Sequence, residues 1–337
     1  MSALNPAGPG VLTAPGEAAA GPGSATVWLG RLRDALPFLG LLALVAWFSS
    51  ASPYFLDSVN ATNLMADAST LLVCAFGMTL VILIGEIDLS VAAMISLLAI
   101  VLARLLAAGL PWPAVVLLVL LAGTGLGLLN GALSVYGDIP SFIVTLGTFS
   151  IATGLAYTLT GSIALPVADQ VFLDVFYTRT WLGVPVPLVL VAFSFVAVWL
   201  FLRRSAVGRE LYAVGANREA ARFSGVRVER VRLLVFGVMG LLVGAGAVFA
   251  AARLGSGAPN AFPTLTLDTI AAVIIGGAAL TGGRASLPRT LLGVLLIAVL
   301  NNGLTLLNVD SSLQYIVKGV IILLAVLLDR SAAQAGR

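Results

Sequence analysis

Long apolar segments alternate with short polar connections along most of the chain. A helix that crosses a membrane needs about 17–25 mostly apolar residues. Ten segments match or approach this length, which predicts an all-α, polytopic membrane protein with about ten transmembrane helices. The predicted spans are residues 36–52, 64–84, 88–108, 112–136, 141–160, 186–202, 232–252, 267–282, 286–307 and 312–329.

The composition and the placement of basic residues support this interpretation. Of 337 residues, 60% are hydrophobic and 10% charged, whereas soluble domains carry about 25% charged residues. If the N-terminus is cytosolic, fourteen Arg fall on the cytosolic side, and only Arg104, Arg179 and Arg253 fall outside. Cytosolic segments are typically enriched in Lys and Arg. We therefore expect both termini in the cytosol and no nucleic-acid partner, because the net charge of +3 reflects topology.

The chain is predicted to form one transmembrane domain, residues 31–330, between two cytosolic tails. Residues 1–30 are rich in Gly, Ala and Pro and lack the pattern of a signal peptide, so we expect a disordered tail, with a short second tail at 331–337. The outer loop, 160–187, contains aromatic residues and could be a docking surface or a lid. The inner loop, 203–232, carries eight Arg and three Glu.

A short helix is predicted within the inner loop. Asn217 can cap its start, and Glu219 in the first turn favours the helix dipole. Gly225 can end the helix in a left-handed conformation. The helix is too polar to span a membrane. It is either a charged topology anchor or a helix that binds a cytosolic partner and transmits force to the membrane domain.

Several kinds of chemistry are missing from the sequence. The chain has no His and one Cys, Cys74, so we predict no catalytic residue and no metal site. A phosphate-binding loop needs a Lys in a Gly-rich motif, and the single Lys, Lys318, lies in no such motif. If ATP drives this protein, another chain hydrolyses it. The alternative is an ion-coupled secondary transporter that uses the intramembrane carboxylates Glu86 and Asp88.

Two apolar segments are interrupted by Gly and polar residues, VILIGEIDLS (81–90) and VIIGGAALTGG (273–283). Such a pair can mark broken helices around a central site, or simply two tight turns between adjacent spans. We expect Asp88 to cap the start of the third span by accepting from the backbone near Ser90 and Val91.

Three further charged residues in or near the apolar segments need an explanation. We expect Glu86 to be an exposed charge at the turn, the alternatives being a substrate contact or a salt bridge to an Arg such as Arg284. Asp67 is expected at the outer surface, the alternative being that it lines the path. Lys318 could pair with an acid that the sequence does not identify.

Six stretches together resemble the permease subunits of bacterial ATP-binding-cassette (ABC) importers for monosaccharides, the ribose/xylose/galactose group. They follow the order of that family and cover about residues 36–330. The stretches are GMTLVILIGEIDLSV (77–91), IPSFIVTLGTFSIATGLAYTLTG (139–161), GRELYAVGANREAARFSGVRV (208–228), LDTIAAVIIGGAALTGGRAS (267–286), LLGVLLIAVLNNGLTLLNV (291–309) and QYIVKGVIILLAVLLD (314–329).

The resemblance implies a set of partners in the bacterial inner membrane. A separate ATPase subunit would bind ATP and Mg, so this chain would need no cofactor and would not be an enzyme. A periplasmic or lipid-anchored sugar-binding protein would dock outside, near the outer loop. A second permease, the same chain or a paralogue, would complete the path among the membrane lipids. The coupling helix that contacts the ATPase would involve Gly215, Asn217, Glu219, Ala220, Arg222, Phe223 and Gly225.

The chain also departs from the common pattern of that family. Glu86 stands where Gly is common, and Leu265–Thr266 replace Tyr-Glu. Ala285 replaces Gly, and Arg289 replaces a small residue. These changes leave open the identity of the sugar and whether the paired permease is identical.

A passage for a neutral sugar needs only weakly polar Asn, Thr and Ser side chains. The same side chains also bond one membrane helix to another, so each candidate has two interpretations. The candidates for the translocation path are Asp88, Ser90, Asn130, Thr145, Thr148, Asn301 and Asn302.

Overall fold

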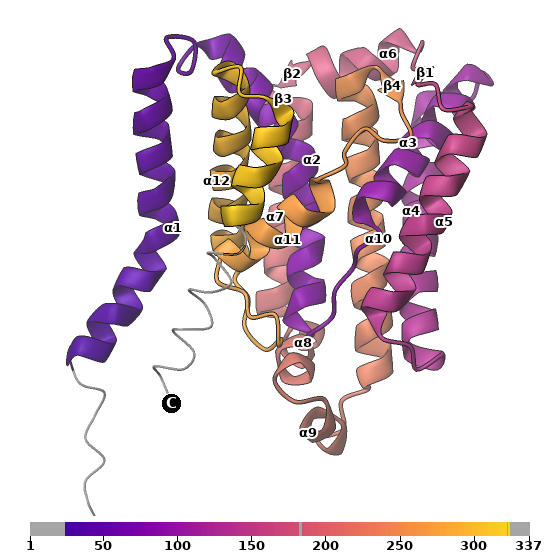
Figure 1. Cartoon of the computed structure of the whole chain (residues 1–337). Helices are drawn as coiled ribbons and strands as arrows, with labels where there is room; N and C mark the ends of the chain where they lie inside the picture. The colour runs from indigo at the N-terminus through magenta and orange to yellow at the C-terminus, as the bar shows by residue number, and fades with distance from the viewer. Residues whose placement is uncertain (1–23, 182–183, 322, 324–337) are drawn as a thin grey trace, which may run out of the picture.

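The computed structural model describes residues 24–181, 184–321 and 323, and this part of the chain folds into a helical bundle with very short strands (Figure 1). The tail 331–337 and residues 1–23 lie outside the described residues. The helices are α1 (Ser24–Ala51), α2 (Ser58–Leu83), α3 (Val91–Ala107), α4 (Trp112–Tyr136), α5 (Ser141–Thr160), α6 (Gln170–Leu173), η1 (Asp174–Thr178), α7 (Val186–Arg204), α8 (Ala206–Ala216), α9 (Arg218–Phe223), α10 (Val228–Leu254), α11 (Leu265–Ile275) and α12 (Leu287–Leu306).

The predicted spans coincide with helices. Six of the described helices are long and apolar enough to cross a membrane, namely α2, α4, α5, α7, α10 and α12. Shorter apolar helices, Leu36–Ala51, Val91–Ala107 and Leu265–Ile275, occupy three other predicted spans. The last predicted span begins in the helical residues 311–321, and its end lies outside the described part. The polytopic all-α prediction is confirmed, and the count of ten spans stays a prediction.

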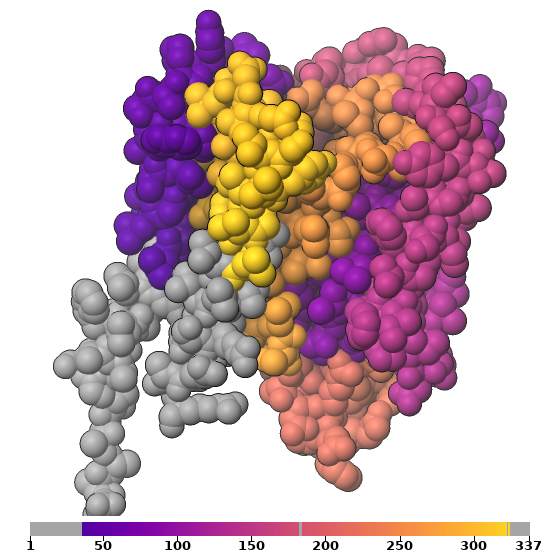
Figure 2. Space-filling view, viewed as in Figure 1, coloured from indigo at the N-terminus to yellow at the C-terminus, as the bar shows by residue number. Residues whose placement is uncertain are grey.

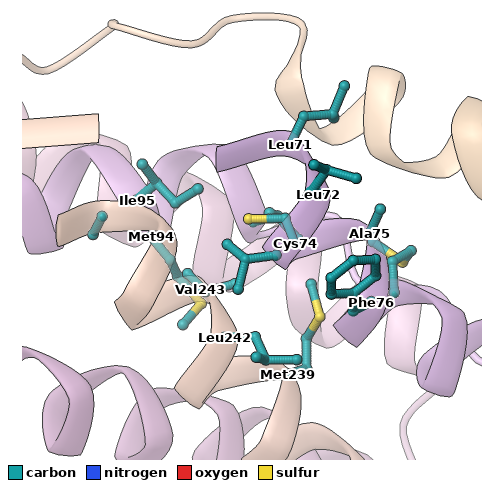
Figure 3. Close-up of a cluster of buried hydrophobic side chains, with 14 of the residues drawn as sticks. Leu71, Leu72, Cys74, Ala75, Phe76, Met94, Ile95, Met239, Leu242 and Val243 are labelled. Carbon is teal, nitrogen blue, oxygen red and sulfur yellow. The ribbon is translucent and has the colours of Figure 1, made fainter. Parts of the chain in front are cut away.

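The central element is α2, which packs against α7, α10, α11 and α12. Every residue from Ala68 to Leu83 is buried. An apolar helix without a polar face is stable where other helices surround it on all sides. Figure 3 shows Cys74 and Phe76 of α2 among Met94 of α3 and Met239 of α10. Cys74 is therefore a core residue with no solvent exposure.

Glycine residues bring α4 and α10 into close contact. A Cβ on Gly240 would lie 2.1 Å from the carbonyl oxygen of Gly123, and one on Gly127 would lie 2.2 Å from that of Phe236. Gly123 and Gly127, like Gly240 and Gly244, are spaced as in the small-xxx-small pattern that brings membrane helices together. This spacing is visible in the sequence, although the contact was not predicted from it.

The two ends of the bundle differ. At one end, called the α9 end, α8 and α9 protrude beyond the long helices (Figures 1 and 2). At the opposite end, the predicted outer loop folds over the helix termini with α6 and η1. There β1 (Leu165–Pro166) pairs with β4 (Ser256–Gly257), and β2 (Thr180–Trp181) pairs with β3 (Val184–Pro185), both antiparallel.

Candidate functional site

The protruding helix α9 has the caps that the sequence predicts. The side chain of Asn217 accepts a hydrogen bond of 3.0 Å from the backbone N–H of Ala220. Glu219 lies in the first turn, and Gly225 follows the helix with φ of +85°. Phe223 is 92% exposed. The local structure of the predicted coupling helix is thereby confirmed, and it presents an aromatic side chain at its end. Arg222 forms an ion pair with Glu229 at the start of α10.

Gly215, unlike the other predicted coupling residues, allows a close contact with the backbone of another segment. A Cβ at this position would lie 1.9 Å from the carbonyl oxygen of Leu83. That same oxygen accepts a hydrogen bond of 2.9 Å from the backbone N–H of Gly283. The end of α8 therefore contacts both Gly-interrupted stretches, which meet here at the α9 end. Both stretches are connections between adjacent helices, as the tight-turn interpretation predicts, and they build a backbone junction.

Glu86 lies in this junction, and the expectation of an exposed charge is wrong. Its side chain is only 6% exposed. One carboxylate oxygen lies 2.7 Å from Nη2 of Arg218 on α9 and 2.8 Å from Nε of Arg232 on α10. The second contact is an ion pair without hydrogen-bond alignment. Two positive charges compensate the buried acid, and neither is Arg284, the partner suggested by the sequence.

The same two arginines connect Glu86 to further segments. Arg218 also donates to the carbonyl oxygen of Ile84 at 3.1 Å. Arg232 donates to Oγ of Ser134 on α4 at 2.9 Å. The coupling helix, the α2–α3 connection, α4 and α10 are therefore joined by one charged cluster. A cavity of about 360 Å³ adjoins it.

Four of the predicted path residues, Asp88, Ser90, Asn130 and Thr148, form a hydrogen-bonded network, and a fifth, Thr145, bonds to the backbone beside it. Oδ1 of Asp88 accepts from the backbone N–H and from Oγ of Ser90, at 2.8 and 2.6 Å. Nδ2 of Asn130 donates to Oγ of Ser90 at 3.2 Å, and Thr148 donates to Oδ1 of Asn130 at 2.5 Å. Thr145 accepts from the backbone N–H of Leu89 at 3.0 Å. The network connects α3, α4 and α5.

This network satisfies its members from within. Asp88, Ser90 and Asn130 are at most 2% exposed, and their polar atoms bond to one another. Asp88 accepts from the backbone N–H of Ser90, as predicted, but the N-cap of α3 is Ser90 and not Asp88. The contacts are those of side chains that hold helices together. The lining role of these residues stays a prediction.

The two remaining path residues, Asn301 and Asn302 of α12, line a cavity at the other side of the bundle. Its volume is about 360 Å³, within the range of small-molecule sites. Asn302 exchanges two hydrogen bonds with Asn60 of α2, of 2.8 and 3.0 Å. Oδ1 of Asn301 is buried and, among the described residues, has no hydrogen-bond partner.

The cavity also contains the partner of Lys318. Its Nζ lies 3.0 Å from Oδ2 of Asp268 in the first turn of α11 and 3.2 Å from Oγ1 of Thr264. The side chains of Lys318 and Asp268 are 12% and 7% exposed. Sequence reasoning did not single out Asp268, although an acid inside an apolar segment is itself a signal of function.

A second ion pair lies at the mouth of this cavity. Nε of Arg253, in the last turn of α10, lies 2.8 Å from Oδ1 of Asp67. The Asp67 side chain is 59% exposed and also lines the cavity, so its predicted place at the outer surface stays a prediction. The Arg253 guanidinium also lies over the ring of Tyr177 in η1, 5.6 Å from its centroid. Since α10 begins next to α9, Arg253 lies at the end opposite to α9.

Long apolar helices, a capped helix that protrudes at one end, and a polar cavity on the other side define a membrane transport subunit. A family model described as the permease component of branched-chain amino acid transport systems matches residues 60–326. The chain belongs to this family of transport permeases.

Curated relatives place the chain among the sugar permeases of this family. It is 40% identical over 295 residues to the ribose import permease protein RbsC of Bacillus subtilis, covering 87% of this chain and 92% of that one. It is 35% identical to the D-allose transport system permease protein AlsC of Escherichia coli, covering 87% and 90%. For the L-arabinose permease protein AraH of Azospirillum brasilense the identity is 35%, covering 86% and 85%. No solved structure matches the chain. The resemblance to monosaccharide ABC permeases is confirmed.

Proposed function

We propose that this chain is the membrane-spanning permease subunit of an ABC importer and that it conducts a monosaccharide into the cell. Its curated relatives carry names of ribose, allose and arabinose permeases. The chain supplies a path and no bond-breaking chemistry, while a separate ATPase binds and hydrolyses ATP. These relatives favour an ABC importer over an ion-coupled transporter.

The observation that carries the proposal is the form of α9. A six-residue helix that is capped at both ends and protrudes from the bundle is a rigid contact element. Phe223, almost fully exposed, offers an anchor for an apolar pocket on the ATPase. Arg218 in the first turn contacts Glu86 and the carbonyl oxygen of Ile84. Movement of α9 would therefore reach the α2–α3 connection directly.

We propose the remaining assignments from the family resemblance, with support from the arrangement of the helices. The α9 end would face the cytosol, with both termini, and the chain would cross the inner membrane about ten times. The outer loop carries the exposed side chains of Ile163 and Trp181 and would dock the binding protein. The exposed apolar faces of α4 and α5 would meet lipid or a second permease, identical or paralogous. Asn301 and Asn302 would line the path.

The test combines Glu219→Arg with Phe223→Ala. We expect a folded permease that no longer binds its ATPase and has lost ATP-driven sugar uptake in proteoliposomes. The matched control, Asp174→Arg with Trp181→Ala, makes the same kinds of change in the outer loop and keeps ATPase binding. Unchanged uptake by the α9 variant would refute the coupling assignment. Uptake that persists without ATP and stops when an ion gradient is removed would refute the ABC assignment.

A further inference from the structure

The cavity beside Asn301 combines features that ordinary helix packing does not explain. Helices α2, α11 and α12 and the helical residues 311–321 all contribute to its lining. Its walls present amide and hydroxyl groups, among them Thr70, Thr305 and Gln314, and the rings of Phe262 and Tyr315. In a bundle this apolar, so many polar groups around one space indicate a ligand rather than a core.

Asn301 gives the most specific sign. Its Oδ1 is a buried acceptor with no partner among the described residues. Buried polar groups nearly always have a partner, so an exception needs an explanation. Asn301 lines the cavity, so rotation of its amide would turn this acceptor toward a hydroxyl donor on a molecule inside it. The adjacent Asn302 does not have such an unsatisfied atom, because its amide forms two hydrogen bonds with Asn60.

The charges of the cavity balance. Two acids, Asp67 and Asp268, and two bases, Arg253 and Lys318, line it, and each acid is paired with one base. A neutral ligand meets no uncompensated charge there. The carboxylate of Asp268 can accept from hydroxyls and the ammonium of Lys318 can donate to them. Adjacent hydroxyls of a sugar supply both donors and acceptors at one place.

We propose that this cavity binds one neutral monosaccharide, with Asn301 and the Asp268–Lys318 pair as its hydrogen-bonding floor. The proposal deepens the function proposed above and rests on it for the class of ligand. Tyr315 and Phe262 supply flat apolar surfaces for the less polar face of the sugar ring. A branched-chain amino acid carries an ammonium and a carboxylate, and the acids and bases that line the cavity are already paired with each other.

The test measures binding to the full-length permease alone, in nanodiscs, by saturation-transfer NMR. The probes are D-ribose, D-allose and L-arabinose, with L-leucine as the contrasting ligand. We expect saturation transfer to at least one of the sugars and none to L-leucine. Asn301→Ala should weaken sugar binding by at least about tenfold, because it removes both hydrogen-bonding atoms of the amide. The control Asn63→Ala changes an asparagine outside the cavity and should bind as the unaltered chain does.

A second variant distinguishes loss of binding from loss of the fold. Asp268→Asn with Lys318→Gln removes both charges together, so that neither remains buried alone, and should also weaken binding. Binding of L-leucine but no sugar, binding of no probe, or unchanged sugar binding in both cavity variants would overturn the proposal. ATP-driven uptake by the assembled transporter is measured separately. If uptake occurs without binding in this cavity, only this inference fails, and if binding occurs without uptake, only the transport proposal fails.

Discussion

Two asparagines, Asn130 and Asn301, look alike in the sequence, since each interrupts an apolar helix. In the fold, the hydrogen-bonding surroundings of the two side chains differ. Asn130 donates to Ser90 and accepts from Thr148 within a buried network. Asn301 borders a cavity, and its Oδ1 has no partner among the described residues. A polar residue inside a membrane helix thus serves structure where neighbours satisfy it, and is available to a ligand where they leave it unsatisfied.

The largest effect is expected on the cavity side. Lys318→Met leaves the nearly buried Asp268 without its partner at 3.0 Å. Removing one member of a buried ion pair costs about 3–5 kcal/mol. We expect a clear fall in the thermal unfolding temperature in detergent. Adding Asp268→Asn should restore most of it. If the single variant unfolds like the unaltered chain, the ion pair does not stabilise this region.

The next effect tests the network directly. Asn130→Ala removes the hydrogen bond that Ser90 Oγ accepts and the acceptor of the Thr148 hydroxyl, while Ser90 keeps its bond to Asp88. The loss should cost about 1–3 kcal/mol. The free energy of unfolding should therefore fall, measured by chemical denaturation in mixed micelles. Thr158→Val, which removes an exposed hydroxyl on α5 that bonds only within its own helix, is the control and should have little effect. Equal stability of the Asn130 and Thr158 variants would contradict the network interpretation.

A smaller effect is expected at the α9 end. Glu86→Gly restores the residue common in the family and removes the acid between Arg218 and Arg232. Hydrogen bonds to charged groups contribute about 1.5–3 kcal/mol, and the partial exposure of Arg218 reduces this value. We expect faster amide hydrogen exchange in α9 and in the α2–α3 connection. The matched control Asp138→Gly removes an acid that lines the same cavity but does not belong to the ion pairs of Glu86 with Arg218 and Arg232. Unchanged exchange in both variants would show that Glu86 does not hold α9.

The smallest effect completes the comparison between the two asparagines. Asn301→Ala removes an oxygen that has no partner, so we expect the free energy of unfolding to change by less than about 1 kcal/mol. The same chemical change therefore separates Asn301 from Asn130 under identical denaturation conditions. A loss at Asn301 as large as that at Asn130 would mean that Asn301, too, serves the fold.

Local patterns predicted much of this molecule. The apolar segments located the helices, and Asn217, Glu219 and Gly225 defined α9, because caps and helix length depend on neighbours in sequence. The glycine spacing that joins α4 to α10 was also available in the sequence.

Contacts between distant segments could not be predicted in the same way. Glu86 lies 132 residues from Arg218, and Lys318 lies 50 from Asp268. A charge in an apolar segment indicates that a partner exists, and only the packing of helices decides which one. For this reason the exposed charge expected at Glu86 was wrong, and the seven path candidates separated into a network and a cavity.

The most direct test of the account compares Asn301→Cys with Asn130→Cys in the assembled importer. The natural Cys74 is fully buried and gives little background with a water-soluble methanethiosulfonate reagent. The account predicts rapid labelling at position 301 that the transported sugar slows, and slow labelling at position 130 whether or not the sugar is present. Equal labelling at both positions, or labelling at position 301 that no transported sugar slows, would contradict the claim that the sugar occupies the cavity beside Asn301.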